Sequence, residues 1–221
     1  MRTIELFSGT GSFSKIAKQL GHETFCIDKF EGLGQLDLKL DLSSEVMCER
    51  LCLDLKDIDF IWASPPCTAF SVAVIGRNWD KETRMPKNES TELGLKILEN
   101  TIKIIAQLKP KYWAIENPRG MMRKVIDDLF IKYGLTNVHR KTVTYCQYEL
   151  HKPVEERRQK PTDLWMNFDW NTKPMCKPSA NCHQSAPRGS RTGTQGLKGN
   201  KERSVIPKEL FIELFENLTC N

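Results

Sequence analysis

Short apolar runs alternate with amphipathic segments along most of the chain. The runs at residues 3–7, 23–28, 60–63, 112–116 and 142–148 are typical of strands. Between them, apolar residues spaced three or four positions apart predict helices over residues 13–20, 46–55 and 125–133, and a helix capped by Ser90 that ends before Lys109-Pro110. Strands that alternate with helices predict an α/β fold with a doubly wound, mostly parallel sheet.

The pattern becomes less regular after Trp165. Residues 171–203 are rich in Pro, Gly, Ser, Thr, Lys and Arg, and a last amphipathic helix is predicted over residues 207–217. Residues 171–203 are compatible with a loop-built recognition segment and equally with a plain linker. We therefore divide the chain into a regular domain, a loop-rich segment and a C-terminal helix, at residues 1–165, 166–203 and 204–221.

Composition and charge narrow the class of protein. Hydrophobic residues make up 39% of the 221 positions and charged residues 28%, a balance that supports a packed core and does not suggest a disordered chain. No apolar run is long enough to cross a bilayer, and strand-like sequence starts at Thr3. We therefore expect an intracellular protein without a signal peptide or a membrane partner. The net charge of +5 is compatible with a nucleic-acid partner but is shared by many unrelated enzymes.

Eight cysteines are distributed over the chain without a Cys-x-x-Cys pair. Cysteines of an intracellular protein are expected to stay reduced. Cys176, Cys182 and His183 form a local group, but their spacing matches no common zinc motif and no fourth ligand is evident. We therefore expect free thiols and no metal.

The first candidate for chemistry is the glycine-rich turn Phe7-Ser8-Gly9-Thr10-Gly11, which follows a strand and opens a helix. Glycine lets the backbone turn sharply and approach a ligand, while the helix N-terminus presents free amide groups. The third glycine of the dinucleotide-binding pattern is missing, because Ser14 stands in its place. Asp28, at the end of the next strand, could accept hydrogen bonds from ribose hydroxyls or simply form a turn.

Two further candidates follow two other strands. A pair of prolines after the strand at 60–63 directs the chain outward and presents Cys67 at the strand end. A thiolate there is a strong carbon nucleophile, although an isolated intracellular cysteine is more often a packed core residue. Glu116 ends the strand at 112–116 and can donate a proton from the same rim, or can begin an ordinary turn with Asn117.

In chain order, the glycine-rich loop, Pro66-Cys67 and Glu116-Asn117 resemble the motifs of the DNA cytosine-5 methyltransferase family, in particular its small phage-type members. Residues 203–207 resemble the family's C-terminal motif, which returns to the cofactor pocket. The resemblance spans nearly the whole chain. It implies a class I, Rossmann-like methyltransferase domain at 1–165, a small target-recognition segment at 166–203, and S-adenosylmethionine as the cofactor.

The resemblance also implies a set of cofactor-binding residues. Asp28 matches the family's acidic residue after the second strand, and Asp41 in Leu40-Asp41-Leu42 matches the motif that follows it. The complete set is Phe7, Ser8, Gly9, Thr10, Gly11, Asp28, Asp41, Leu42, Pro65 and Val205.

The family mechanism assigns a role to each catalytic residue. The thiolate of Cys67 would add to C6 of cytosine and make C5 nucleophilic, while Glu116 would hydrogen-bond and protonate N3. The family's Gln-x-Arg-x-Arg pattern is not intact here, since Gln147 stands ten residues before Arg157. Of the two neighbouring arginines we take Arg158 as the one that holds the base oxygen. Pro118 also differs, because most members carry Val there.

Basic residues in two loops predict contacts with DNA. The loop at 71–90, with Ser71 and Arg77, is suited to close over a base that has been flipped out of the duplex. Arg188 and Arg191 are predicted to contact phosphates. The expected reaction is therefore transfer of a methyl group to C5 of a flipped cytosine in duplex DNA.

Three alternatives remain open at this point. The same motifs also serve cytosine methylation of transfer RNA, and an inactive nucleic-acid-binding relative would keep the fold. A nicotinamide-dependent oxidoreductase would use a similar glycine-rich loop but leaves Cys67 and Glu116 without a role. The oligomeric state is not predicted, because no heptad pattern or large apolar stripe stands out.

Overall fold

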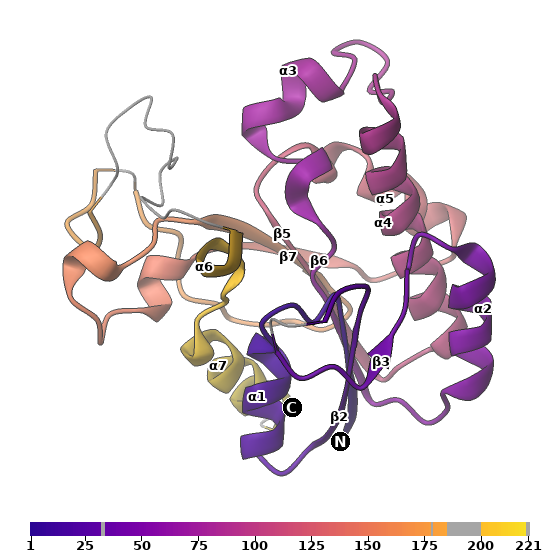
Figure 1. The fold of residues 1–221 in the computed structure, drawn as a ribbon. Coiled ribbons are helices and arrows are strands. Elements are labelled where there is room, and N and C mark those ends of the chain that lie inside the picture. Colours follow the sequence, from indigo (N-terminus) through magenta and orange to yellow (C-terminus); the bar gives the residue numbers. More distant parts are fainter. Residues whose placement is uncertain (32–33, 178, 185–199, 220–221) are drawn as a thin grey trace.

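The described strands form one sheet of seven strands in a computed structural model that describes residues 1–31, 34–177, 179–184 and 200–219 (Figure 1). Their order across the sheet is β3-β2-β1-β4-β5-β7-β6. Strand β7 runs antiparallel to β5 and β6, whereas every other described pair is parallel. The strands are β1 Arg2–Leu6, β2 Glu23–Asp28, β3 Leu38–Lys39, β4 Phe60–Ala63, β5 Tyr112–Pro118, β6 His139–Thr144 and β7 Pro161–Met166.

Helices cover both faces of this sheet (Figure 1). One face packs against α2 Glu45–Asp54, α4 Glu89–Leu108 and α5 Ile126–Lys132. The opposite face packs against α1 Ser12–Gln19 and α7 Lys208–Thr219. Two short helices, α3 Ile75–Asn78 and α6 Asn200–Ser204, belong to the connecting segments. The predicted doubly wound, mostly parallel sheet is therefore confirmed.

An aromatic cluster joins the two ends of the chain in one core. The ring of Phe13 in α1 stacks on Phe60 and Trp62 of β4, at centroid distances of 5.4 and 5.8 Å. Phe211 of α7 meets Trp62 edge-on at 4.8 Å. Pairs of this kind contribute about 0.5–1.5 kcal/mol each beyond their buried area. Helix α7 is therefore an integral part of the core built by the first strands, and it carries the segment before it back to β1.

Several element boundaries differ from the sequence prediction, among them one helix cap and one strand end. Helix α4 is capped by Asn88, whose Oδ1 accepts a hydrogen bond from the amide of Thr91 at 3.0 Å, so the prediction of Ser90 as the cap was wrong. Asparagine and serine cap helices about equally well, so local propensity could not choose between them. The predicted strand at 142–148 ends at Thr144 and continues as a 3-10 turn, Tyr145–Tyr148.

The segment at 71–90, predicted to be a polar loop, is anchored to the core. Trp79 is fully buried, and its indole N–H donates to the carbonyl of Ala69 at 2.7 Å. Its ring packs on Phe70 at a centroid distance of 5.7 Å. Helix α3 directly precedes Trp79, so this tryptophan fixes the base of the segment that carries Arg77.

No helix in the described part of the chain combines the length and the apolar character that a membrane span requires.

Candidate active site

The strand order reverses between β1 and β4, and both strands point in the same direction. In open α/β sheets, ligands bind outside the carboxyl ends of the strands at such a switch point. The glycine-rich turn follows β1 at this edge, and the Pro-Pro-Cys turn follows β4. The topology therefore brings the two strongest sequence motifs together.

The glycine-rich turn is held open by its backbone conformation and by Asp28. Phe7, Gly9 and Gly11 have positive φ angles of 61°, 48° and 65°. For Phe7 this conformation is strained, and such strain is concentrated at functional sites. The amide of Gly9 donates to Oδ2 of Asp28 at 2.9 Å. Asp28 therefore shapes the turn through one carboxylate oxygen.

Glu5, a residue that the sequence analysis did not select, caps helix α1 from within β1. The helix begins after Gly11, which has no side chain to cap it. The two carboxylate oxygens of Glu5 accept hydrogen bonds from the amides of Phe13 and Ser14, at 3.2 and 2.9 Å. Burial raises the pKa of Glu5 from 4.5 to about 7, although these amides and Ser14 oppose the shift.

This raised pKa predicts a pH dependence of stability. The folded state holds a proton on Glu5 up to about pH 7, whereas the unfolded chain releases it above about pH 4.5, so the free energy of unfolding falls as the pH rises through that window. The whole effect amounts to about 3 kcal/mol. Urea denaturation at pH 5 and pH 8 should show that Glu5→Gln removes this difference. Glu49→Gln, at an exposed position of α2, is the matched control, and equal pH dependence in wild type and Glu5→Gln would contradict the assignment.

Cys67 opens a short turn at the end of β4. The 3-10 turn Cys67–Ala69 follows Pro66, and the amides of Phe70 and Ser71 both donate to the carbonyl of Cys67 at 3.0 Å. The side chain of Cys67 is half-buried and lines the cavity described below. Burial raises the pKa of the Cys67 thiol, the positive charges of Lys160 and Arg203 lower it, and the charge of Glu116 raises it.

Three contacts tie the cysteine turn to the strand that carries Glu116. The side-chain amide of Asn117, which is fully buried, donates to the carbonyl of Pro65 at 2.8 Å. The amide of Met121 donates to the carbonyl of Phe70 at 2.7 Å. Gly120 approaches the same carbonyl so closely that a Cβ atom would lie 2.2 Å from its oxygen. Cys67 and Glu116 are therefore held in one rigid unit.

Glu116 lies among hydrogen-bonding and charged groups. It is 5% exposed, and its Oε1 accepts a hydrogen bond from the hydroxyl of Tyr145 at 2.9 Å. Burial, together with the charge of Glu116, raises the pKa of Tyr145 well above its usual range, so this hydroxyl stays a neutral donor. Nζ of Lys160 lies 3.8 Å from the same Oε1 and donates to the carbonyl of Arg203 at 3.2 Å. The cation beside Glu116 is therefore Lys160.

Arg158 has a different set of partners. Its Nε and backbone amide donate to the buried carboxylate of Glu149, each at 2.8 Å, and its Nη2 forms a further contact with the same carboxylate. Burial raises the pKa of Glu149. The hydrogen bonds and the positive charge of Arg158 lower the pKa by more than burial raises it, so the net shift is downward. Nη1 of Arg158 donates to the carbonyls of Val205 at 2.7 Å and Glu202 at 3.3 Å.

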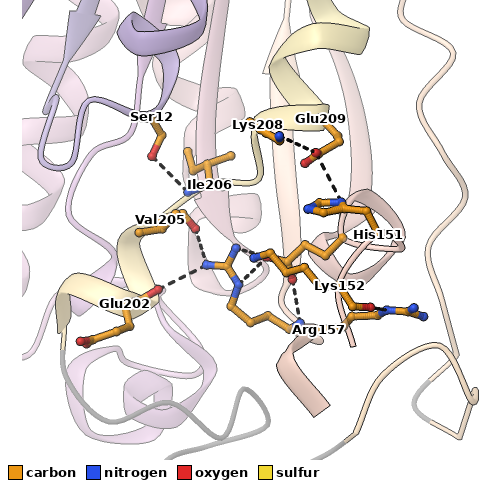
Figure 2. Close-up of polar contacts among 11 residues, drawn as sticks. Ser12, His151, Lys152, Arg157, Glu202, Val205, Ile206, Lys208 and Glu209 are labelled. Atoms are coloured by element: carbon orange, nitrogen blue, oxygen red, sulfur yellow. Dashed lines mark hydrogen bonds and ion pairs between the residues drawn. The ribbon is translucent and has the colours of Figure 1, made fainter. Parts of the chain in front are cut away.

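These bonds fix the C-terminal segment. Figure 2 shows Glu202 and Val205 in this network, and the amide of Ile206 donating to the hydroxyl of Ser12 at the start of α1, at 3.3 Å. The segment therefore runs between the turn that contains Arg158 and the glycine-rich turn. The guanidinium of Arg158 serves to hold it there.

Several of the residues described above surround a cavity of about 620 Å³. Among the described residues, the predicted site residues that line it are Phe7, Ser8, Gly9, Thr10, Pro65, Cys67, Ser71, Arg77 and Glu116. Those that stand outside its lining are Gly11, Asp28, Asp41, Leu42, Arg158 and Val205. Asp28 and Gly11 shape the turn beneath it, and Asp41 pairs with Lys29 at 2.7 Å, which lowers its pKa to about 2. Arg188 and Arg191 lie outside the described residues.

Sequence reasoning missed several lining residues. Lys160, Arg203 and Ile206 line the cavity together with Cys67 and Glu116, and so do Glu5 and Ser12. The similarity of residues 203–207 to a motif near the cofactor was a usable signal for Arg203 and Ile206. Lys160 carried no comparable signal, because it stands in a basic run that resembles a solvated loop.

The mostly parallel sheet, with β7 inserted antiparallel between β5 and β6, and the glycine-rich turn after β1 are features of a class I methyltransferase fold. A family model described as C-5 cytosine-specific DNA methylase matches residues 1–151. The chain therefore belongs to the C-5 cytosine-specific DNA methylase family, which confirms the resemblance read from its motifs.

Individual relatives agree with this assignment. Over 235 aligned residues the chain is 28% identical to a probable DNA (cytosine-5)-methyltransferase of Frog virus 3, and the match covers 98% of this chain and 99% of the viral protein. A methyltransferase structure of S. pombe, Dnmt2, has a TM-score of 0.50 at 16% identity, covering 78% of this chain and 52% of that one. A structure described as a putative DNA modification methyltransferase encoded in an E. coli prophage has a TM-score of 0.50 at 17% identity, covering 98% of this chain and 69% of that one. The two structures support the fold alone.

Proposed function

We propose that the protein transfers a methyl group from S-adenosylmethionine to C5 of cytosine in DNA through a covalent bond between Cys67 and C6. The observation that carries this proposal is the shared cavity. Cys67 and Glu116 line it together with the glycine-rich turn and Lys160. A nucleophile, an acid and a cofactor loop at one switch point are the groups that this reaction needs.

The cavity fits the cofactor. Its volume of about 620 Å³ is within the range of small-molecule sites, and one wall is the turn at the N-terminus of α1. Bound there, S-adenosylmethionine supplies an electrophilic methyl group. Phe7, Ser8, Gly9 and Thr10 supply the wall, and Asp28 holds the turn in shape through its bond to Gly9. Asp41, Leu42, Pro65 and Val205 remain predictions for cofactor contacts.

Cys67 and Glu116 act on different atoms of the cytosine base. The thiolate of Cys67 donates an electron pair to C6, and the displaced ring electrons make C5 nucleophilic. Glu116, in its protonated form, donates a hydrogen bond and then its proton to N3. After methyl transfer a base removes the proton from C5, and the bond between C6 and Cys67 breaks to return the thiolate.

We propose Lys160, in place of Arg158, as the cation that holds the base oxygen. Nζ of Lys160 lies 3.8 Å from Oε1 of Glu116 and lines the cavity, whereas the guanidinium of Arg158 is paired with Glu149. A base whose N3 contacts Glu116 presents its O2 on the neighbouring ring position. Lysine at this place also supports the thiolate form of Cys67.

Polar and basic residues that line the cavity indicate where DNA would contact the protein. Ser71 and Arg77 line it from the segment that Trp79 anchors, and Arg203 lines it from helix α6. We propose that these residues receive a cytosine flipped out of the duplex, and that Arg188 and Arg191 contact the flanking phosphates. In this arrangement residues 1–165 form the catalytic domain, 166–203 the recognition segment and 204–221 the returning helix, and the protein acts inside the cell, where its substrate lies.

A labelling experiment tests the proposed function. The purified protein is incubated with methyl-labelled S-adenosylmethionine and with duplex DNA, single-stranded DNA or transfer RNA. We expect label on C5 of cytosine in DNA, identified after digestion to nucleosides. Label in transfer RNA alone would mean that the substrate is transfer RNA and not DNA, while the proposed mechanism would stand. Cofactor binding without label in any nucleic acid would overturn the proposed activity.

A further inference from the structure

Four potential metal ligands meet at one point away from the catalytic cavity. Cys146 comes from the 3-10 turn after β6, and Cys176, Cys182 and His183 come from the segment after β7. Their sulfur atoms and a ring nitrogen of the histidine all lie within 4.8 Å of one another. Cys146 is fully buried, and Cys176 and His183 are 9% and 5% exposed.

Four of the six distances between these atoms, at 3.2–3.8 Å, lie near the edges of a tetrahedral zinc site. Zinc bonds of about 2.3 Å to sulfur and about 2.0–2.1 Å to nitrogen place two sulfurs about 3.8 Å apart and a sulfur and a nitrogen about 3.6 Å apart. Sγ of Cys146 lies 3.2 Å from Sγ of Cys176 and 3.8 Å from Sγ of Cys182. Nδ1 of His183 lies 3.7 Å from Sγ of Cys176 and 3.3 Å from Sγ of Cys182.

We propose that Cys146, Cys176, Cys182 and His183 bind one structural zinc ion. Three cysteines and one histidine form a complete ligand set that leaves no coordination position open, which is typical of structural and not of catalytic zinc. The fourth ligand, Cys146, stands 30 residues before Cys176, and for this reason the sequence alone indicated only three ligands and free thiols. On binding, the three thiols release their protons to solvent and the sulfurs coordinate as thiolates.

Hydrogen bonds around the cluster support this assignment. The side-chain amide of Gln147 donates to Sγ of Cys182 at 3.2 Å, the kind of bond that stabilises a thiolate ligand. The amide of Cys176 donates to the hydroxyl of Thr144 at 2.8 Å. This bond fixes the segment after β7, which contains Cys176, against the end of β6. Nη1 of Arg157 donates to the carbonyl of Cys182 at 3.3 Å. The ligands are therefore oriented by their surroundings.

The position of the site gives it a structural role. Cys146 is the neighbour in sequence of Tyr145, whose hydroxyl contacts Glu116. His183 comes two positions before the stretch 185–199, which holds Arg188 and Arg191. A zinc ion at this point joins the turn beside the catalytic acid to the beginning of the basic stretch. It would thus attach the recognition segment to the catalytic domain.

The experiment measures the metal content of the full-length protein, produced without a polyhistidine tag. Mass spectrometry of the metals should find about one zinc ion per chain in the wild type. Cys176→Ser and Cys182→Ser should lose this zinc, whereas Cys52→Ser, on α2 and outside the cluster, should retain it. Because a ligand variant that loses its metal could also lose its fold, a second measurement uses the wild type alone. After chelation, titration with cobalt should produce thiolate-to-metal charge-transfer bands and tetrahedral visible bands.

Two results would overturn the proposal. One is a folded wild-type protein that holds no zinc, binds no cobalt and has Cys146, Cys176 and Cys182 alkylated as fast as Cys52. The other is a disulfide between Cys146 and Cys176 in protein isolated under reducing conditions. The readout is metal content, which does not depend on methyl transfer, so this inference and the proposed function stand or fail independently.

Discussion

Replacement of Cys67 by serine will abolish methyl transfer and leave cofactor binding intact. The serine hydroxyl has nearly the same size as the thiol but remains protonated at neutral pH, so it cannot add to C6. The loss should be about 10⁴-fold or more, the scale seen when a covalent catalyst loses its nucleophile. The measurement is the rate of label incorporation into DNA, beside the dissociation constant for S-adenosylhomocysteine from calorimetry.

The matched control is Cys52→Ser, which replaces a half-buried cysteine on α2 outside the cavity and should retain full activity. A second control is trapping: duplex DNA with 5-fluorocytosine should form a covalent complex with the wild type and none with Cys67→Ser, because fluorine cannot leave C5 as a proton does. A trapped complex with Cys67→Ser would move the nucleophile to another residue. Loss of cofactor binding in a folded variant would make Cys67 part of the cofactor site.

Most of the fold was accessible from the sequence because its elements follow local rules. Strands β2 and β4 have the predicted bounds, since their apolar runs are short and are bounded by polar residues. Strand β7 was missed, because Leu164-Trp165-Met166 is a very short apolar run after a basic stretch. Its insertion between β5 and β6 depends on pairing with two distant strands, which no local pattern reports.

The residues of the candidate site likewise fall into those that local sequence predicts and those that only the folded chain brings together. Cys67 and Glu116 were selected because one follows and the other ends a recognisable strand-like run. Asn117 was interpreted as part of a possible turn, yet its side chain joins the two motifs by bonding to Pro65 across 52 positions. The role of Lys160 and the fourth cysteine of the metal cluster depend likewise on segments that meet only in the folded chain. Sequence patterns therefore selected the candidate reactive groups, and the contacts that position them required the structure.

The two neighbouring cations, Arg158 and Lys160, should respond to substitution in opposite ways. Arg158→Met leaves the carboxylate of Glu149 buried without its main partner, and breaking such a pair usually costs about 3–5 kcal/mol. Lys152 still contacts Glu149 at 2.9 Å, so we expect a loss of stability near the lower limit, about 3 kcal/mol. Urea denaturation measures it. Arg157→Met, which removes bonds only to backbone carbonyls, is the matched control and should cost about 1–2 kcal/mol.

Lys160→Met should instead preserve the fold and reduce the rate of methyl transfer by about 10²–10³-fold, the scale of one lost group that stabilises transition-state charge. It should also raise the pKa of Cys67, because the positive charge of Lys160 lowers that pKa in the wild type. Alkylation of Cys67 by iodoacetamide over a range of pH values reports this shift, which a purely structural lysine would not cause. Lys160→Arg keeps the positive charge, so it should retain most of the methyl-transfer rate and most of the lowering of the Cys67 pKa. If Arg158→Met proved stable and inactive while Lys160→Met remained active, the base oxygen would belong to Arg158, and the ion pair with Glu149 would have to open when DNA binds.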